Sequence, residues 1–129
     1  MPNLNIAGTD RTPEVDFKTD VGHLRLAGES YPEDVTAFYR PIFAALDAHL
    51  AELGTGSCRF DLALLYFNSS SAKAIMMLLE KLDAAAAKGA RVDVHWSYDE
   101  EDDTMQELGE EFGEDISHAT FHLEKLTTG

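Results

Sequence analysis

Apolar residues recur every three or four positions along three stretches of the chain, which is the spacing of one face of an α-helix. The spacing predicts amphipathic helices over about 34–53, 71–88 and 102–113. The positions that carry it are Val35, Phe38, Tyr39, Ile42, Phe43, Leu46, Leu50 and Leu53, then Ile75, Met76, Leu79 and Leu82, then Met105, Leu108 and Phe112.

The starts of the first two helices carry residues that commonly cap helices. Ser30 or Asp34 is the candidate cap of the first helix, and Ser70 or Ser71 is the candidate cap of the second. Pro41 lies inside the first helix, so that helix either kinks there or Pro41 opens a second helical piece.

Other stretches have the patterns of β-strands. Residues 58–67 (CRFDLALLYF) are almost continuously apolar, which is typical of a central strand covered on both faces. Further strands are expected at 4–8 and 15–19, possible edge strands, and at 23–27, 91–98 and 120–126, with a short tail at 127–129.

From residue 58 onward, strands and helices alternate. This order favours right-handed crossovers and a largely parallel sheet, while the earlier strands can pair antiparallel. We therefore expect one α/β domain over 1–129, with a mixed central sheet and about three packed helices.

Composition and charge limit the classes of partner and the location that we expect for this chain. The 129 residues are 44% hydrophobic, which is typical of a folded chain, and their formal net charge is −14. Such an acidic chain is a poor partner for nucleic acid or anionic lipid, but it suits a partner with a basic face. The sequence shows no signal peptide or membrane-spanning segment, so we expect the cytoplasm and no membrane insertion. Cys58 lies in an apolar run and is expected in the core.

Residue patterns of enzymes and metal sites are missing from the sequence. There is no glycine-rich nucleotide loop, and the acidic run Asp99–Asp103 lacks the spacing of a calcium loop. Asp93 and His95 share a strand face and with Asp61 resemble an acid–base set, but no nucleophile accompanies them. The histidines at positions 23, 49, 95, 118 and 122 lack ligand spacing. We expect no enzymatic activity, no cofactor and no metal.

Three consecutive serines, Ser69 to Ser71, stand where the apolar strand gives way to the second helix (LLYFNSSSAKAIMM, 64–77). Functional groups gather at the carboxyl ends of strands in open α/β sheets, and a helix N-terminus favours negative charge. Capping needs only one of these hydroxyls. The plainest interpretation is that one serine is the cap and the others are ordinary polar residues.

Four segments resemble the SiaC family of bacterial regulatory phosphoproteins. LLYFNSSSAKAIM is similar to that family's Leu-Tyr-Leu-Asn-Thr-Ser-Ser-x-Lys-Ala-Met stretch, and GESYPED (28–34) resembles its Gly-Asp-Ser-Tyr-Pro-Glu segment. NIAGTDRTPEV (5–15) and WSYDEEDDTMQELGEEFGED (96–115) fit as well, so the likeness runs from about residue 3 to 124. The resemblance implies a STAS-like domain, related in fold to anti-sigma-factor antagonists.

The resemblance also implies a partner switch controlled by phosphorylation. A serine/threonine protein kinase would add the phosphate and a PP2C-type phosphatase would remove it. The unphosphorylated form would bind and activate a diguanylate cyclase, which links the switch to cyclic-di-GMP and biofilm control. By position, the phosphoacceptor is Ser69, where the family pattern has Thr. The expected switch surface comprises Asn68, Ser69, Ser70, Ser71, Lys73, Tyr31 and Pro32.

A phosphate adds about −1.5 to −2 charges, which would increase repulsion from an acidic patch on the partner or clash in a tight interface. Two other functions compete with this one. The chain could be a constitutive interaction domain without phosphorylation. It could also be a small ligand-binding domain or hydrolase, which a deep polar pocket near His95 would favour.

Overall fold

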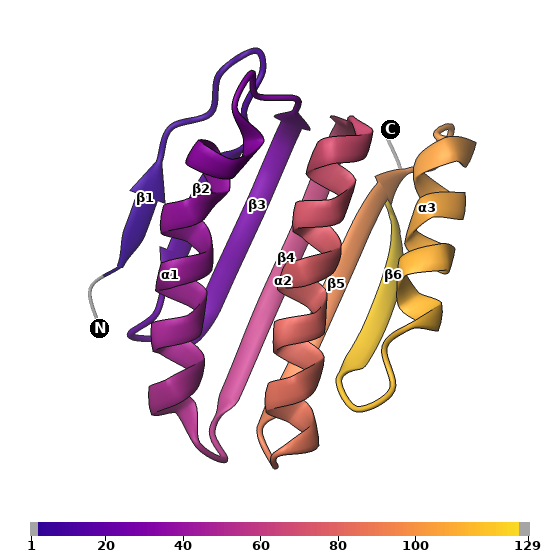
Figure 1. Ribbon diagram of the computed structural model, residues 1–129. Helices are drawn as coiled ribbons and strands as arrows, with labels where there is room; N and C mark the ends of the chain where they lie inside the picture. The colour runs from indigo at the N-terminus through magenta and orange to yellow at the C-terminus, as the bar shows by residue number, and fades with distance from the viewer. Residues whose placement is uncertain (1–2, 127–129) are drawn as a thin grey trace.

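A computed structural model describes residues 3–126, which form a six-stranded sheet and three helices (Figure 1). This architecture confirms the predicted α/β fold class. The expected tail at 127–129 lies outside the described residues. The elements are β1 (Leu4–Ile6), β2 (Glu14–Lys18), β3 (His23–Ser30), α1 (Val35–Leu53), β4 (Ser57–Phe67), α2 (Ser69–Ala87), β5 (Arg91–Asp99), α3 (Asp103–Glu114) and β6 (Thr120–Leu126).

The strands lie side by side in chain order, and the sheet is mixed as predicted. β1, β2 and β3 pair antiparallel, whereas β3, β4, β5 and β6 pair parallel. Because each new parallel strand is added on the same side, right-handed connections place every crossover helix on one face. Figure 1 shows α1, α2 and α3 together in front of the sheet.

The prediction that residues 58–67 are covered on both faces is wrong. Burial alternates along most of β4, because helices cover only one face of the sheet. At the C-terminal end of β4, a β-bulge rather than burial of both faces accounts for the continuous apolar run. Gly28 pairs with Leu64 and Glu29 pairs with Tyr66, so Leu65 is an extra residue in a β-bulge. The bulge returns Phe67 to the core and leaves Leu65 68% and Tyr66 50% exposed.

The core lies between the helices and the covered face of the sheet. Its side chains form rows across the strands, because register partners on neighbouring strands point to the same face. One row is Phe17, Leu24, Phe60, Val94 and Phe121, and the next is Val15, Leu26, Leu62, Trp96 and Leu123. The helices pack on these rows through Tyr39, Ile42, Leu46, Ile75, Leu78, Leu79, Leu82, Met105 and Phe112.

The start of α1 settles the choice between two caps. The Asp34 carboxylate accepts a hydrogen bond from the Ala37 N–H at 3.0 Å, so Asp34 is the cap. Ser30 belongs instead to the end of β3. Pro41 lies within one helix and opens no second one. Ala37 and Pro41 are both exposed, so water can reach the carbonyl that the proline leaves without its helical donor.

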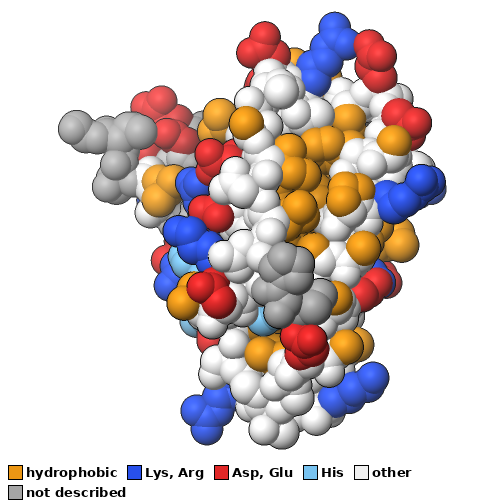
Figure 2. Space-filling view, turned by 90° about the vertical axis from the view of Figure 1, so that its left-hand side faces the viewer, with side chains coloured by type: hydrophobic (Ala, Val, Ile, Leu, Met, Phe, Trp, Pro, Cys, Tyr) orange, Lys and Arg blue, Asp and Glu red, His pale blue; other side chains and the backbone are white. Residues whose placement is uncertain are grey.

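The uncovered face of the sheet is polar and internally paired. Glu14 accepts a hydrogen bond from Arg25 at 3.1 Å, and the His95 ring pairs with Glu124 at 2.6 Å. The His95 ring also stacks on His122, with ring centroids 4.3 Å apart. Figure 2 shows charged and histidine side chains along its left-hand side, and a band of hydrophobic ones right of the centre. Because these polar side chains pair with one another, this face of the sheet can contact solvent without a second layer of helices.

Asp83 on α2 holds the segment that leads into β6. Its carboxylate accepts N–H donors from three consecutive residues, Ser117 to Ala119, the shortest at 2.7 Å. Burial raises the pKa of the Asp83 carboxyl, but these donors outweigh burial and hold the pKa below its usual range. A carboxylate with a lowered pKa stabilises the fold at neutral pH. That contribution is lost as pH falls below about 4.

We therefore expect Asp83→Asn to lower the free energy of unfolding by about 1–2 kcal/mol at pH 7, because a neutral amide oxygen accepts these N–H donors more weakly than a carboxylate does. The difference from the natural protein should shrink toward pH 3. Urea denaturation at both pH values measures it. Glu80→Gln, an exposed change in the same helix, is the control and should stay within about 0.5 kcal/mol. A difference that is the same at both pH values would contradict this role.

Candidate functional site

The junction between β4 and α2 brings the three serines to the carboxyl end of the sheet. α2 begins at Ser69 rather than at residue 71, and its cap is Asn68. The Asn68 side-chain oxygen accepts the Ser71 N–H at 2.9 Å. The prediction that Ser70 or Ser71 caps this helix is therefore wrong, since asparagine is an equally good cap and lies in position to act.

The three serines have different environments. Ser69 and Ser70 are exposed in the first turn of the helix, whereas Ser71 is fully buried. The Ser30 hydroxyl donates to the Ser71 hydroxyl at 2.8 Å and lies 2.6 Å from the Tyr39 hydroxyl. Because Ser30 has one hydrogen, Tyr39 donates to Ser30. The chain of hydroxyls ties α1, β3 and α2 together, so Ser71 is a structural residue.

Burial raises the pKa of Tyr39, and the hydrogen bonds to Ser30 and Ser71 only partly offset this effect. Tyr39 therefore stays neutral and keeps its proton for Ser30 at physiological pH. The network is a fixed support under the exposed serines rather than an acid–base device.

Replacing Ser71 by alanine is expected to lower the free energy of unfolding by about 1–2 kcal/mol, because the buried Ser30 hydroxyl loses its acceptor. Ser70→Ala is the matched control and should change stability by less than about 0.5 kcal/mol, since Ser70 is exposed. Urea denaturation of both variants measures the contrast. Equal stabilities would mean that the hydroxyl chain does not support α2.

Tyr31 and Pro32 lie near the same edge of the sheet, because the ends of β3 and β4 are linked. The Asn68 N–H donates to the Ser30 carbonyl at 3.2 Å. The Tyr31 ring contacts the bulged strand through Tyr66, with ring centroids 5.7 Å apart. Pro32 follows directly and is half-buried. The structure thus brings the predicted Tyr31 into contact with the strand that leads into the serines.

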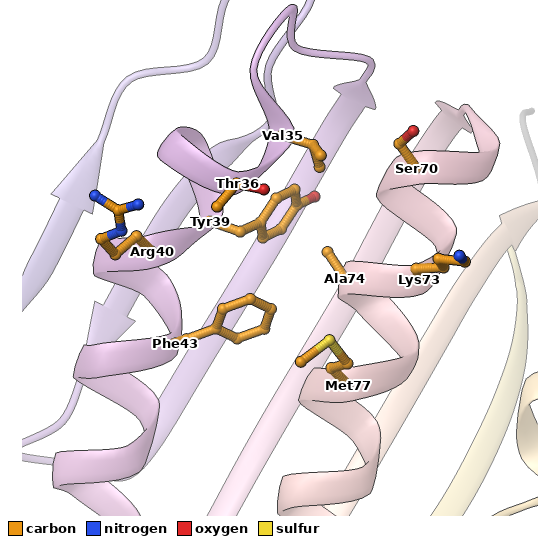
Figure 3. Close-up of a pocket in the computed structure, with 9 residues that line it drawn as sticks. All are labelled: Val35, Thr36, Tyr39, Arg40, Phe43, Ser70, Lys73, Ala74 and Met77. Carbon is orange, nitrogen blue, oxygen red and sulfur yellow. The ribbon is translucent and has the colours of Figure 1, made fainter.

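Beside Ser70, a groove of about 440 Å³ runs between α1 and α2 (Figure 3). Ser70, Lys73, Ala74 and Met77 line it from α2. Val35, Thr36, Tyr39, Arg40 and Phe43 line it from α1. Ser70 and Lys73, predicted as switch-surface residues, therefore belong to a larger concave surface. Ser69 is not among its lining residues but directly precedes Ser70.

The groove residues of α1 were not predicted as functional. Val35, Tyr39 and Phe43 follow the helical stripe and were assigned to the core. Tyr39 is indeed fully buried and forms the floor, but Val35 and Phe43 are only partly buried. The sequence offers no signal that separates Val35 and Phe43 from the core, because eight apolar residues over 35–53 are the usual number for one buried helix face.

The other residues considered for catalysis or metal binding are either buried in the core or paired with neighbouring side chains. Cys58 is 2% exposed, and burial raises the pKa of its thiol to about 11, which confirms a core residue rather than a nucleophile. Asp93 pairs with His122 at 3.0 Å and His95 pairs with Glu124, as surface pairs on the open face. Asp61 joins His23 and Arg59 instead. Within residues 3–126, no group of histidine, cysteine and acidic residues has the geometry to hold a metal ion.

No helix in the described part of the chain is long and apolar enough to cross a membrane.

Comparison with known proteins gives consistent matches over almost the whole chain. The family model described as SiaC family regulatory phosphoprotein matches residues 6–126. An uncharacterized protein of Pseudomonas aeruginosa strain UCBPP-PA14 is 38% identical over 117 residues, which cover 91% of this chain and 92% of the relative.

Solved structures match equally well. SiaC of Pseudomonas aeruginosa is 36% identical with a TM-score of 0.90, and the match covers 98% of this chain and 100% of that one. A second structure contains the diguanylate cyclase SiaD of Pseudomonas aeruginosa in complex with its activator SiaC. It matches at 36% identity with a TM-score of 0.90, over 95% of this chain and 99% of that one.

Proposed function

Because the chain belongs to the SiaC family of regulatory phosphoproteins, we propose that it binds and activates a diguanylate cyclase and that phosphorylation of Ser69 switches this binding off. The observation that carries the proposal is the strong likeness to SiaC, which is the activator of a diguanylate cyclase in a solved complex. The protein would act as a non-enzymatic cytoplasmic regulator in cyclic-di-GMP signalling.

Position and exposure support Ser69 as the phosphoacceptor. A kinase needs a hydroxyl that it can reach, and Ser71 is fully buried. Ser69 and Ser70 are both exposed, but Ser69 aligns with the threonine of the family pattern, directly after the Asn68 cap. Asn68 already accepts the Ser71 N–H, so modification of Ser69 leaves the cap in place.

The environment of Ser69 supports a switch that changes surface charge and leaves the fold intact. A phosphate on the first turn of a helix lies near free N–H groups and the positive end of the helix dipole. The modification is therefore tolerated or slightly stabilising for α2. Binding would change because the phosphate adds negative charge and bulk to the surface that meets the cyclase. A serine/threonine protein kinase and a PP2C-type phosphatase would set its occupancy.

The experiment that tests this proposal is phosphopeptide mass spectrometry on the protein isolated from its own host in two growth conditions. Trypsin releases Phe60–Lys73, a peptide that contains all three serines, and fragmentation distinguishes them. We expect phosphate on Ser69 at an occupancy that changes with condition. Phosphate confined to Ser70, or a peptide that is unmodified in both conditions, would refute Ser69 as the switch.

A further inference from the structure

We propose that the thioether of Met77 is a site of reversible oxidation, and that its sulfoxide form weakens binding to the cyclase. The inference rests on the proposed function for the identity of the partner. Its physical basis is an accessible sulfur-containing side chain in the apolar groove beside the exposed serines (Figure 3).

The sulfur-containing side chains of residues 3–126 differ in their access to solvent. Met77 is 48% exposed, whereas Met105 is 4% and Cys58 is 2% exposed. Met76 is half-buried. Burial also raises the pKa of the Cys58 thiol to about 11, so little of the reactive thiolate forms at neutral pH. A small oxidant in water therefore reaches Met77 more readily than the other described sulfur atoms.

The reaction transfers one oxygen atom from a hydroperoxide to the Met77 sulfur. The Sδ lone pair attacks the terminal peroxide oxygen, so that an S–O bond forms and the O–O bond breaks. With hydrogen peroxide, the proton of the transferred oxygen passes to the departing hydroxide, which leaves as water. Sulfur loses two electrons and the peroxide gains them, so the step needs no other reactant. A thiol-dependent methionine sulfoxide reductase restores the thioether.

The surroundings of Met77 favour a thioether over a sulfoxide. Tyr39 and Ala74 are buried and form the floor of the groove. Figure 3 shows the Phe43 ring and the Met77 side chain directed toward each other across it. A thioether is apolar and adapts to the shape of a partner, whereas a sulfoxide is polar. Phe43 and Ala74 offer the new oxygen no hydrogen-bond donor, so oxidation replaces an apolar contact surface with a hydrated one.

The groove is continuous with the surface that is expected to bind the cyclase. Ser70 and Lys73 belong to both, and Met77 follows Lys73 by four residues on the same side of α2. One turn of a helix is only about 5.4 Å long, so a cyclase that covers Ser70 and Lys73 also meets Met77. Burying a sulfoxide in that contact without a hydrogen bond costs affinity. Oxidation and phosphorylation would therefore act on one surface by different chemistry.

Limited treatment of the folded protein with hydrogen peroxide tests the site. Trypsin releases Ala74–Lys81, which contains Met76 and Met77, and fragmentation distinguishes the two. We expect Met77 sulfoxide to form about tenfold faster than Met105 sulfoxide, because exposure controls the access of the oxidant. In urea, the methionines should react at similar rates. Oxidation of Met76 or Met105 as fast as Met77 in the folded protein would overturn the inference.

Cyclase activation measures the effect of the sulfoxide. After catalase has removed the peroxide, oxidised protein should need about fivefold higher concentrations than untreated protein for half-maximal activation. Methionine sulfoxide reductases with dithiothreitol should restore the untreated curve. Met77→Leu has no sulfur at this position, so its curves before and after peroxide should coincide. Met76→Leu is the matched control and should respond to peroxide as the natural protein does. A loss of activation by treated Met77→Leu would show that Met77 is not the responsible site.

The same measurements separate this inference from the proposed function. If the unmodified protein did not activate the host's diguanylate cyclase, both would fail. If it did, and phosphoserine at position 69 blocked activation while Met77 sulfoxide left the curve unchanged, only the Met77 inference would be wrong. Thermal unfolding of the oxidised protein should match that of the untreated protein within about 2 °C, because Met77 lies outside the core. A larger loss would mean that oxidation acts on the fold and not on the groove.

Discussion

Protein that carries phosphoserine at position 69 is expected to bind its cyclase at least tenfold more weakly than the unmodified protein. The phosphate places about two negative charges at the exposed start of α2, beside the groove and within reach of Lys73. Like charge at an interface costs a few kcal/mol, and about 1.4 kcal/mol corresponds to tenfold in affinity. Amber suppression supplies the homogeneous phosphoprotein, and calorimetry measures the affinity.

Phosphoserine at position 57 is the matched control for this experiment. Ser57 is exposed at the opposite end of the strand that leads to Ser69, so the added charge is the same and only its place differs. Phosphoserine there should leave the affinity within about twofold at 0.15 M salt, because distant charges are screened. Equal weakening by both phosphates would mean that net charge alone governs binding, and Ser69 would lose its special role.

Replacing Gly109 by valine is expected to lower the free energy of unfolding by about 3 kcal/mol, the upper end for an overpacked core. A Cβ atom at Gly109 would lie 2.6 Å from Leu123 Cδ1 and 2.7 Å from two atoms of the Trp96 ring. Trp96 cannot move away easily, because it is 1% exposed and its Nε1 donates to the Met105 carbonyl at 3.1 Å. The larger side chain would therefore push α3 off the sheet.

Glu107→Val provides the comparison for Gly109→Val. Glu107 is exposed on the same helix, so this variant introduces valine without the overlap. Helix propensity alone would make Glu107→Val the more costly change, because valine is a poorer helix former than glutamate but a better one than glycine. In urea denaturation, Glu107→Val should lower the free energy of unfolding by less than about 1 kcal/mol. If both variants lost the same free energy, the close contact between α3 and Trp96 would not limit residue size at position 109.

The order of strands and helices could be predicted because the periods of apolar residues differ between them. The run Leu64–Phe67 was misinterpreted, because a β-bulge makes four consecutive apolar residues without burying both faces. A bulge depends on pairing with β3, and no local pattern along β4 reports that pairing.

Part of the site could also be predicted from the sequence. The likeness to the family pattern selected Ser69, and the structure places it exposed in the first turn of α2. The cap was assigned wrongly because asparagine and serine cap helices about equally well. The identity of the cap depends on tertiary contacts, because Ser71 lies in the core, where it is hydrogen-bonded to Ser30 and through Ser30 to Tyr39.

The groove depends on how two helices lie beside each other on the sheet. Phe43 and Met77 are 34 positions apart in the chain, and nothing in either helix indicates that they border one cavity. Similarly, the pairing of His95 with Glu124 depends on the register between β5 and β6. Sequence patterns identify the face of an element, whereas such sites require the placement of elements relative to one another.

The most direct measurement of the central claim is diguanylate cyclase activity as a function of added protein. The unmodified protein and Ser69→Ala should both raise the rate of cyclic-di-GMP formation, since each leaves the surface at α2 without added charge. Protein with phosphoserine at position 69 should raise it little or not at all at the same concentrations. Full activation by the phosphorylated protein would contradict the account, because the exposed hydroxyl of Ser69 would then not control the cyclase.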